Sequence, residues 1–113
     1  MAIIVQEETD AEAENTMNVF REGFDEEGFR NMLRSYGMID AEIGKENAMT
    51  ARARTGFMAP HIAGSSATII KRIEQVIDET GLDGLMLIFP DYEKGLKNLA
   101  KEVLPALRAR YSA

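Results

Sequence analysis

The sequence predicts an α/β protein whose strands run parallel. Two short apolar runs, at residues 2–5 and 85–89, lack the alternation of a strand that has one side in water. Segments with the 3.6-residue spacing of amphipathic helices lie between these runs and after the second one. Strands that alternate with helices are typical of a parallel sheet whose faces are covered by helices.

The first strand is expected over residues 2–6, and a helical insertion over residues 10–50. Thr9 and Glu12 stand three residues apart, as in a capping box, and so mark the start of this insertion. Gly37 is typical of a helix end inside it.

The insertion is followed by a predicted loop over residues 51–64. Ile39 and Ile43 indicate another short helix or turn before it. Small residues, two arginines and Pro60 favour the loop, which has room for a short strand.

A helix is predicted over residues 66–80, capped by Ser65 or Ser66. It presents one apolar stripe, formed by Ile69, Ile70, Ile73, Val76 and Ile77. Gly81 fits a left-handed helix end.

The last strand is expected over residues 84–89, and a final helix over residues 92–110. Pro105 lacks an N–H group, so this helix should bend or restart there.

Composition limits the classes of partner. The 113 residues fit a single domain, and 45% of them are hydrophobic. The net charge of −6 argues against nucleic acid, which needs a positive surface. There is no cysteine, so a disulfide or a cysteine metal site is excluded. No signal peptide is recognisable, and no apolar run approaches the roughly 20 residues that cross a membrane; a soluble, cytoplasmic protein is expected.

Several stretches resemble the luciferase-like, flavin-dependent monooxygenases. Residues 57–66 (FMAPHIAGSS) resemble the entry into the family's penultimate helix, and residues 80–92 (TGLDGLMLIFPDY) its last strand. Residues 8–13 (ETDAEA) and 103–107 (VLPAL) continue the resemblance, which extends over nearly the whole chain. The pyrimidine, aminopolycarboxylate and alkanesulfonate monooxygenases are the most similar subgroup.

This resemblance implies a partial (β/α)8, TIM-type barrel, of which the chain supplies roughly the last three β/α units with a helical insertion. Such barrels have about 250 residues. Members of the family oxygenate a small organic substrate with O2 and reduced FMN, which a separate reductase supplies. Their flavin contacts come mainly from earlier strands. A protein partner or self-association is therefore expected to cover the incomplete barrel.

Active sites of these barrels lie at the carboxyl ends of the strands, and the resemblance makes Arg52 and Arg54 catalytic candidates. The related enzymes carry an arginine in a mobile loop of this region, which closes the site over flavin and substrate. The alternative is a pair of solvated surface arginines. His61 is a third catalytic candidate, but no partner at useful spacing supports a triad or a metal site, so a structural role is the alternative.

Gly64, Ser65 and Ser66 form a candidate cofactor site. The start of a helix offers free N–H groups to an anion, and barrels often bind phosphate near this helix. A serine that caps the helix explains the same residues without a ligand.

Phe89, Asp91 and Tyr92 follow the last strand and are candidates for substrate contact. Some relatives have a tyrosine and a histidine here beside the flavin, whereas this chain has Phe89 and Asp91. Asp91 alternatively caps the final helix. Glu7 and Glu8 are interpreted as solvated residues at a helix end.

The sequence leaves more than one function open. The first is a C-terminal part or subunit of an FMN-dependent monooxygenase. The alternatives are a noncatalytic α/β interaction or dimerisation module, and a truncated product without function.

Overall fold

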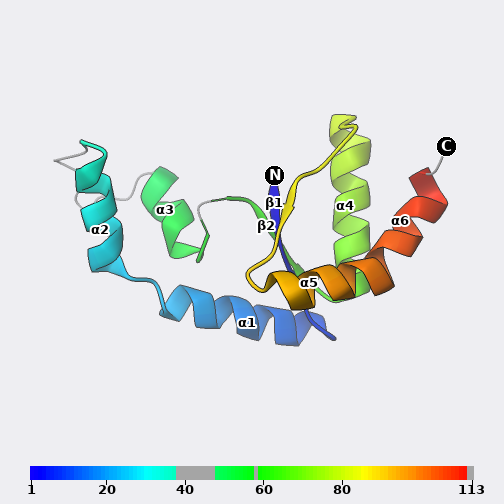
Figure 1. Ribbon diagram of the computed structural model, residues 1–113, viewed down its shortest axis with the longest axis horizontal. Coiled ribbons are helices and arrows are strands. Elements are labelled where there is room, and N and C mark those ends of the chain that lie inside the picture. Colours follow the sequence, from blue (N-terminus) through cyan, green and yellow to red (C-terminus); the bar gives the residue numbers. More distant parts are fainter. Residues whose placement is uncertain (38–47, 58, 112–113) are drawn as a thin grey trace.

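A computed structural model describes residues 1–37, 48–57 and 59–111 of the chain as a three-stranded parallel sheet with helices around it (Figure 1). Strand β1 (Ala2–Gln6) lies at the centre, between β2 (His61–Gly64) and β3 (Leu87–Ile88). Ile3 is paired with His61 on one side and with Ile88 on the other. The prediction of an α/β protein with parallel strands is confirmed.

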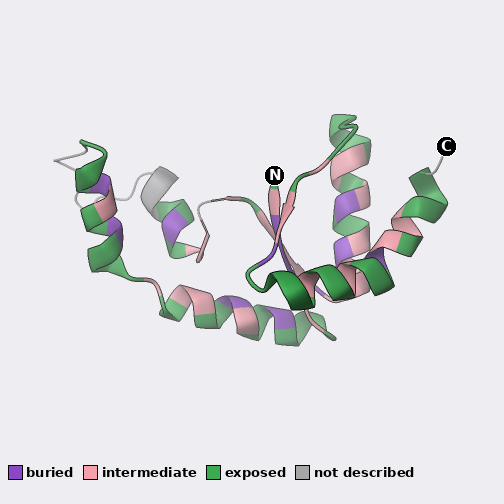
Figure 2. Cartoon of the chain, in the orientation of Figure 1, coloured by how far each residue is buried: buried purple, intermediate pink, exposed green. Residues whose placement is uncertain are grey.

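Strand β1 is covered on both faces, as its continuous apolar sequence predicts. Ile3, Ile4 and Val5 are all buried (Figure 2). On one face Ile4 packs in the main core, whose other buried members are Ile69, Ile73, Phe89 and Val103. Helix α1 (Asp10–Glu22) contacts β1 and β2 and buries Ala13 and Met17 completely.

The helical insertion contains α1, α2 (Glu26–Ser35) and α3 (Ala48–Arg54). The cap at Thr9 is confirmed, since its side chain accepts a hydrogen bond from the Glu12 N–H at 3.1 Å. The short helix or turn expected around Ile39 and Ile43 falls outside the described residues.

The loop expected over residues 51–64 is wrong in its first part, which is helical, whereas the short strand for which it left room is present. Helix α3 continues to Arg54, because alanine and arginine are strong helix formers. Strand β2 forms at residues 61–64, where pairing with β1 satisfies the backbone.

Helix α4 (Ser66–Thr80) has the bounds and the ends that its sequence predicts. The Ser65 side chain accepts a hydrogen bond from the Thr68 N–H, and Gly81 takes a left-handed conformation with φ 68°. The Gly81 N–H donates to the Ile77 carbonyl at 2.8 Å, which closes the last turn.

The predicted final helix is divided into three parts: α5 (Tyr92–Asn98), the π-helical turn η1 (Leu99–Val103) and α6 (Leu104–Tyr111). The Leu104 N–H donates to the Leu99 carbonyl, five residues back. Pro105 follows at once and cannot donate to the ladder, so the interruption occurs where the sequence predicts it.

Strand β3 is shorter than the predicted strand over residues 84–89. Leu87 and Ile88 pair with β1, opposite Ala2 and Ile3, and the last hydrogen bond in this direction runs from the Ala2 N–H to the Met86 carbonyl at 2.9 Å. A strand extends only as far as a neighbour supplies hydrogen bonds, and in the described chain the other edge of β3 has no neighbour.

The order of the strands differs from that of a barrel. In a (β/α)8 barrel each strand lies beside the next one in the chain, which would place β2 at the centre. Here β1 is central, and β3 pairs with the edge of β1 that β2 leaves open. The described residues therefore form an open α/β sheet without a closed barrel. None of their helices is long and apolar enough to cross a membrane.

Candidate functional site

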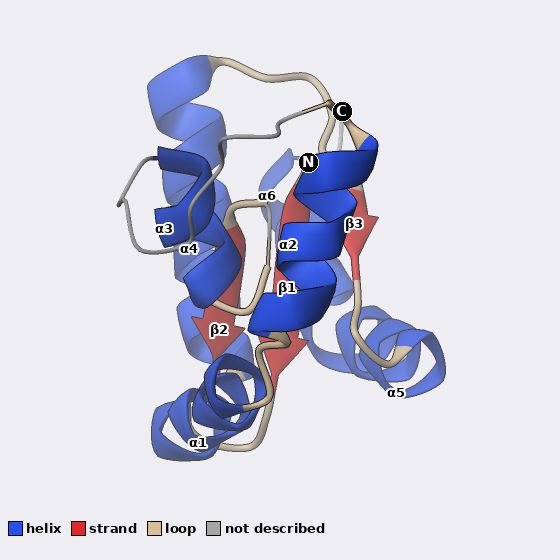
Figure 3. Ribbon diagram, turned by 90° about the vertical axis from the view of Figure 1, so that its left-hand side faces the viewer, coloured by secondary structure: helices blue, strands red, loops and turns tan. Residues whose placement is uncertain are grey.

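The carboxyl ends of all three strands meet at one edge of the sheet, where α1 and α5 also lie (Figure 3). The second strand of the chain, β2, lies on one side of β1, and the third strand, β3, lies on the other side. The direction in which successive strands extend the sheet therefore reverses between β1 and β3. In open α/β sheets, ligands bind outside the carboxyl ends of the strands at such a reversal. This edge is therefore the candidate functional site.

An ion pair crosses this edge between Glu7, just after β1, and Lys94 in α5. Lys94 Nζ lies 3.0 Å from Glu7 Oε1 and 2.9 Å from Oε2, and the Thr16 hydroxyl donates to Oε1 at 3.2 Å. The Glu7 side chain is only 19% exposed, against 52% for Lys94. The interpretation of Glu7 as a solvated helix end is therefore wrong, because the fold brings a lysine and a hydroxyl onto its carboxylate.

Gln6, the last residue of β1, is 7% exposed and is the only polar residue among the buried side chains that the structure describes. Its Nε2 group donates to Glu102 Oε2 at 3.0 Å. Its Oε1 atom is buried and has no hydrogen-bond partner among the described residues. An acceptor left this way costs about 1–3 kcal/mol.

Two cavities share Gln6, Glu7 and Lys94. The smaller, about 180 Å³, lies between β1, α1 and the start of α5, and Thr16, Phe20 and Asp91 also line it. The larger, about 450 Å³, is polar. Its lining consists of Gln6, Glu7, Glu8, Glu12, Lys94, Asn98, Lys101 and Glu102.

The start of α4, the candidate cofactor site, is already occupied by a carboxylate of the chain. Asp10 Oδ1 accepts hydrogen bonds from the Ser65 N–H at 2.8 Å and from the Thr68 hydroxyl at 2.7 Å. The Ser65 N–H, and after it the Thr68 hydroxyl, lower the pKa of Asp10 from its usual value. A Cβ atom on Gly64 would lie 2.6 Å from Thr68 Cγ2 and 2.9 Å from Asp10 Oδ1, so Gly64, Thr68 and Asp10 are tightly packed. Ser66 begins the helix beside them.

The residues after β3 have structural roles. Phe89 is buried in the main core, and its ring lies 6.0 Å from that of Tyr92. Asp91 Oδ1 accepts a hydrogen bond from the Lys94 N–H at 3.0 Å and so caps α5, as the alternative interpretation has it. Asp91 also lines the smaller cavity, and Tyr92 is exposed.

The remaining candidates do not join this edge. Arg52 and Arg54 lie in α3, and Arg54 Nη2 is 3.8 Å from Glu26 Oε1 in α2. His61 is the first residue of β2, at its amino end, about 10 Å along the strand from the carboxyl edge. Its ring lies 6.1 Å from that of Phe57.

Four residues at this edge were not among the site candidates taken from the sequence: Gln6, Glu7, Lys94 and Glu102. A usable signal was present for the first two, because they follow a buried strand directly. No local pattern indicates Lys94 or Glu102, which the fold of α5 and η1 brings to Glu7 and Gln6.

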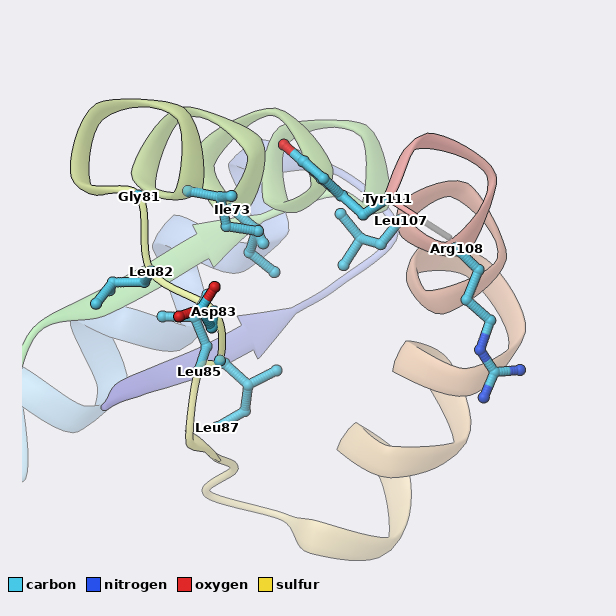
Figure 4. Close-up of a pocket in the computed structure, with 11 residues that line it drawn as sticks. Ile73, Gly81, Leu82, Asp83, Leu85, Leu87, Leu107, Arg108 and Tyr111 are labelled. Atoms are coloured by element: carbon cyan, nitrogen blue, oxygen red, sulfur yellow. The ribbon is translucent and has the colours of Figure 1, made fainter. Parts of the chain in front are cut away.

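A further cavity, larger than these two, lies at the opposite, amino-terminal side of β3 (Figure 4). It has a volume of about 660 Å³, and apolar side chains such as Ile73, Leu85 and Leu107 converge on it, while Arg108 points away. We place the functional site at the carboxyl edge despite the smaller cavities there, because polar side chains make up the lining of the 450 Å³ cavity. Most residues that line the 660 Å³ cavity are apolar, and Asp83 and Tyr111 are among its few polar ones.

Parallel strands with polar side chains at their carboxyl edge are typical of α/β enzymes, and sequence comparison points to one class of them. The chain is similar to several curated proteins named pyrimidine monooxygenase RutA. It is 26% identical to the one from Methylorubrum extorquens over 112 residues, which are 96% of this chain and 30% of the relative. Identity to the one from Pseudomonas syringae pv. syringae is 26% over 110 residues, with the same coverage.

These similarities confirm the resemblance to part of a luciferase-like monooxygenase. The protein from Bradyrhizobium sp. is 24% identical over 111 residues. The chain spans about 30% of the length of these relatives. No protein-family model and no solved structure matches it significantly.

The residues at this edge do not fit FMN by themselves. The phosphate of FMN needs N–H donors or cations. At the start of α4, however, the Ser65 N–H already donates its hydrogen bond to the Asp10 carboxylate. The larger cavity has four carboxylates and two lysines in its lining, which disfavours an anion. The described residues also contain no group of three or more side chains that could hold a metal ion.

Proposed function

We propose that the chain forms part of a flavin-dependent monooxygenase, to which it contributes strands and covering helices of a larger (β/α)8 barrel. The observation that carries this proposal is the similarity to pyrimidine monooxygenases, which extends over 96% of the chain. In this proposal the enzyme uses reduced FMN, supplied by a separate reductase, and O2 to oxygenate a small organic substrate.

The flavin in this proposal is held by the remainder of the barrel. This assignment follows from the poor fit of FMN to the carboxyl edge and from the Asp10 carboxylate at the start of α4. The chain would then contribute the wall of the substrate site, with Glu7, Lys94 and Asp91 nearest to it.

The proposal also requires further strands, from a protein partner or by self-association. Among the described residues, β2 and β3 each have one edge without a neighbouring strand. Open edges of this kind pair with other strands. In the barrel order, β3 would leave β1 and pair with the open edge of β2.

A segment exchange tests the proposal. The matching 30% of the Methylorubrum extorquens pyrimidine monooxygenase is replaced by this chain, and FMN binding and reductase-dependent oxygen consumption are measured. We expect saturable FMN binding. A control exchange that carries Gly64→Val should lose FMN binding, because this substitution disrupts the packing of β2 against α4. A folded exchange protein that binds no FMN contradicts the proposal.

The isolated chain provides the complementary measurement. Titration with FMN, followed by flavin fluorescence, should show no saturable binding, because the described residues do not form the flavin site. Saturable binding would instead place the cofactor on this chain and contradict its assignment to the remainder of the barrel.

A noncatalytic interaction module is the second candidate, and one observation favours it. The order β2-β1-β3 differs from barrel order and buries the most apolar strand without additional strands. This candidate predicts that the chain unfolds cooperatively by itself and that the segment exchange fails to fold.

A further inference from the structure

The side-chain oxygen of Gln6 is a polar atom that the described fold leaves unsatisfied. Its Nε2 group donates to Glu102 at 3.0 Å. An ionised carboxylate accepts hydrogen bonds but cannot donate, so this bond fixes which end of the amide faces Glu102. Gln6 Oε1 therefore points elsewhere as an acceptor, and it is buried without a donor.

Gln6 also lines the larger cavity at the carboxyl edge. The volume of about 450 Å³ is within the usual range for small-molecule sites. Lys94 is held by both carboxylate oxygens of Glu7, so these two charges compensate each other. The other charged groups of the lining are Glu8, Glu12 and Glu102 against Lys101, which gives the cavity an excess of negative charge.

The location is favourable for binding on independent grounds. The cavity opens beside the carboxyl end of β1, next to the point where the strand order reverses toward β3. Ligands of open α/β sheets bind at such a point.

We propose that this cavity binds a small organic cation through its primary ammonium group. Gln6 Oε1 accepts one of the three ammonium N–H groups, and the carboxylates of Glu8, Glu12 and Glu102 balance its charge. An anion would be repelled by this excess of carboxylates, and a neutral amide would leave their charge uncompensated. Because Oε1 is covered by protein atoms, binding requires a small movement of the lining side chains.

This inference depends on Gln6 and its cavity, not on the proposed monooxygenase function. The test is a titration of the 15N-labelled chain with ethanolamine, followed by the NMR signals of the glutamine side-chain amides. Gln6 and Gln75 are the two glutamines of the sequence, which makes the assignment simple. Gln75 lies on α4, where it bonds to Glu79, and serves as the internal control.

We expect a saturable shift of the Gln6 amide signals and no shift of the Gln75 signals. Propionate and propionamide, matched in size, should shift neither pair. Calorimetry should show at least a tenfold loss of ethanolamine affinity in Gln6→Leu, which removes the acceptor at similar volume. Gln75→Leu should bind as the unchanged chain does.

An unshifted Gln6 signal would overturn the proposal and indicate that a water molecule satisfies the oxygen. An equal shift with propionamide would overturn it too, because the cavity would then bind a neutral amide as well as a cation. Undiminished binding by Gln6→Leu would overturn it as well. If Gln6→Leu does not fold, the comparison of the three ligands on the unchanged chain decides the question. The titration contains no flavin, so its outcome is separate from that of the segment exchange.

Discussion

At the scale of single residues, Asp10 joins two helices at their amino-terminal ends. It is the first residue of α1, and its carboxylate accepts from Ser65 and Thr68 at the start of α4. A negative charge is favourable at both positions, because unpaired N–H groups give a helix start a partial positive charge. A carboxylate of the chain thus satisfies the helix start that the sequence suggested for a cofactor.

Asp10→Asn should lower the free energy of unfolding at neutral pH, since the amide lacks the charge that these donors favour. The pKa of Asp10 is lowered by folding, so its contribution is complete above the ordinary aspartate pKa of about 4 and is lost as the pH falls toward the folded value. Urea unfolding of both chains between pH 7 and pH 3 measures this. A stability difference that does not shrink on acidification would contradict the assignment.

Gly64 is required by a close approach between β2 and α4. A Cβ atom there would lie 2.6 and 2.8 Å from two carbon atoms of Thr68, and 2.9 Å from Asp10 Oδ1. Gly64→Ala should therefore lower the free energy of unfolding by about 1–3 kcal/mol. Gly84→Ala is the matched control, because no atom lies within 4 Å of the added carbon. Equal effects of the two substitutions in thermal unfolding would refute this account.

At the scale of elements, the π-helical turn η1 places Val103 in the main core, where it is 0% exposed. Val103→Ala removes two methyl groups and leaves a cavity, and should cost about 2–3 kcal/mol of stability. Val19→Ala on α1, where the side chain is 65% exposed, should change stability by less than about 0.5 kcal/mol. Denaturant unfolding of both variants checks whether η1 is held by this contact.

The elements that the sequence predicted best are those whose signals are local. The caps at Thr9 and Ser65 and the left-handed Gly81 depend on residues a few positions away, and all three are present. The length of β3 was not predictable in this way. Leu85 and Met86 are as apolar as the two residues of β3, yet whether they belong to the strand depends on a neighbouring strand that the local sequence does not describe.

The same distinction explains which parts of the candidate site were missed. The carboxyl-end rule identified residues 64–66 and 89–92, and it would also have identified Gln6 and Glu7 if it had been applied to the first strand. The partner of Glu7 is 87 positions away in the chain, so the ion pair could be found only from the fold.

At the scale of the whole molecule, the described residues include two separate clusters of buried apolar side chains. One surrounds Ile4 and Ile69, and the other joins α2 and α3 through Phe29, Leu33 and Ala53. Figure 1 shows α2 and α3 on one side of the sheet and α4 and α6 on the other. The second cluster is small, so α2 and α3 should have lower local stability than the sheet and α4.

Native-state hydrogen exchange should show this difference directly. We expect the amides of α2 to exchange faster than those of β1 and α4, and Phe29→Ala to accelerate α2 and α3 alone. The matched substitution in the main core, Ile69→Ala, should accelerate exchange in β1 and α4 as well. Uniform acceleration by Phe29→Ala would show that the two clusters unfold together.

The central position of β1 also has a consequence for the order of events during synthesis. Ile3 leaves the ribosome before His61 and Ile88, the two residues with which it pairs. Long-range pairing of this kind slows folding and leaves apolar segments without cover in the meantime. The nascent chain must therefore carry Ile3, Ile4 and Val5 unpaired until β2 and then β3 emerge.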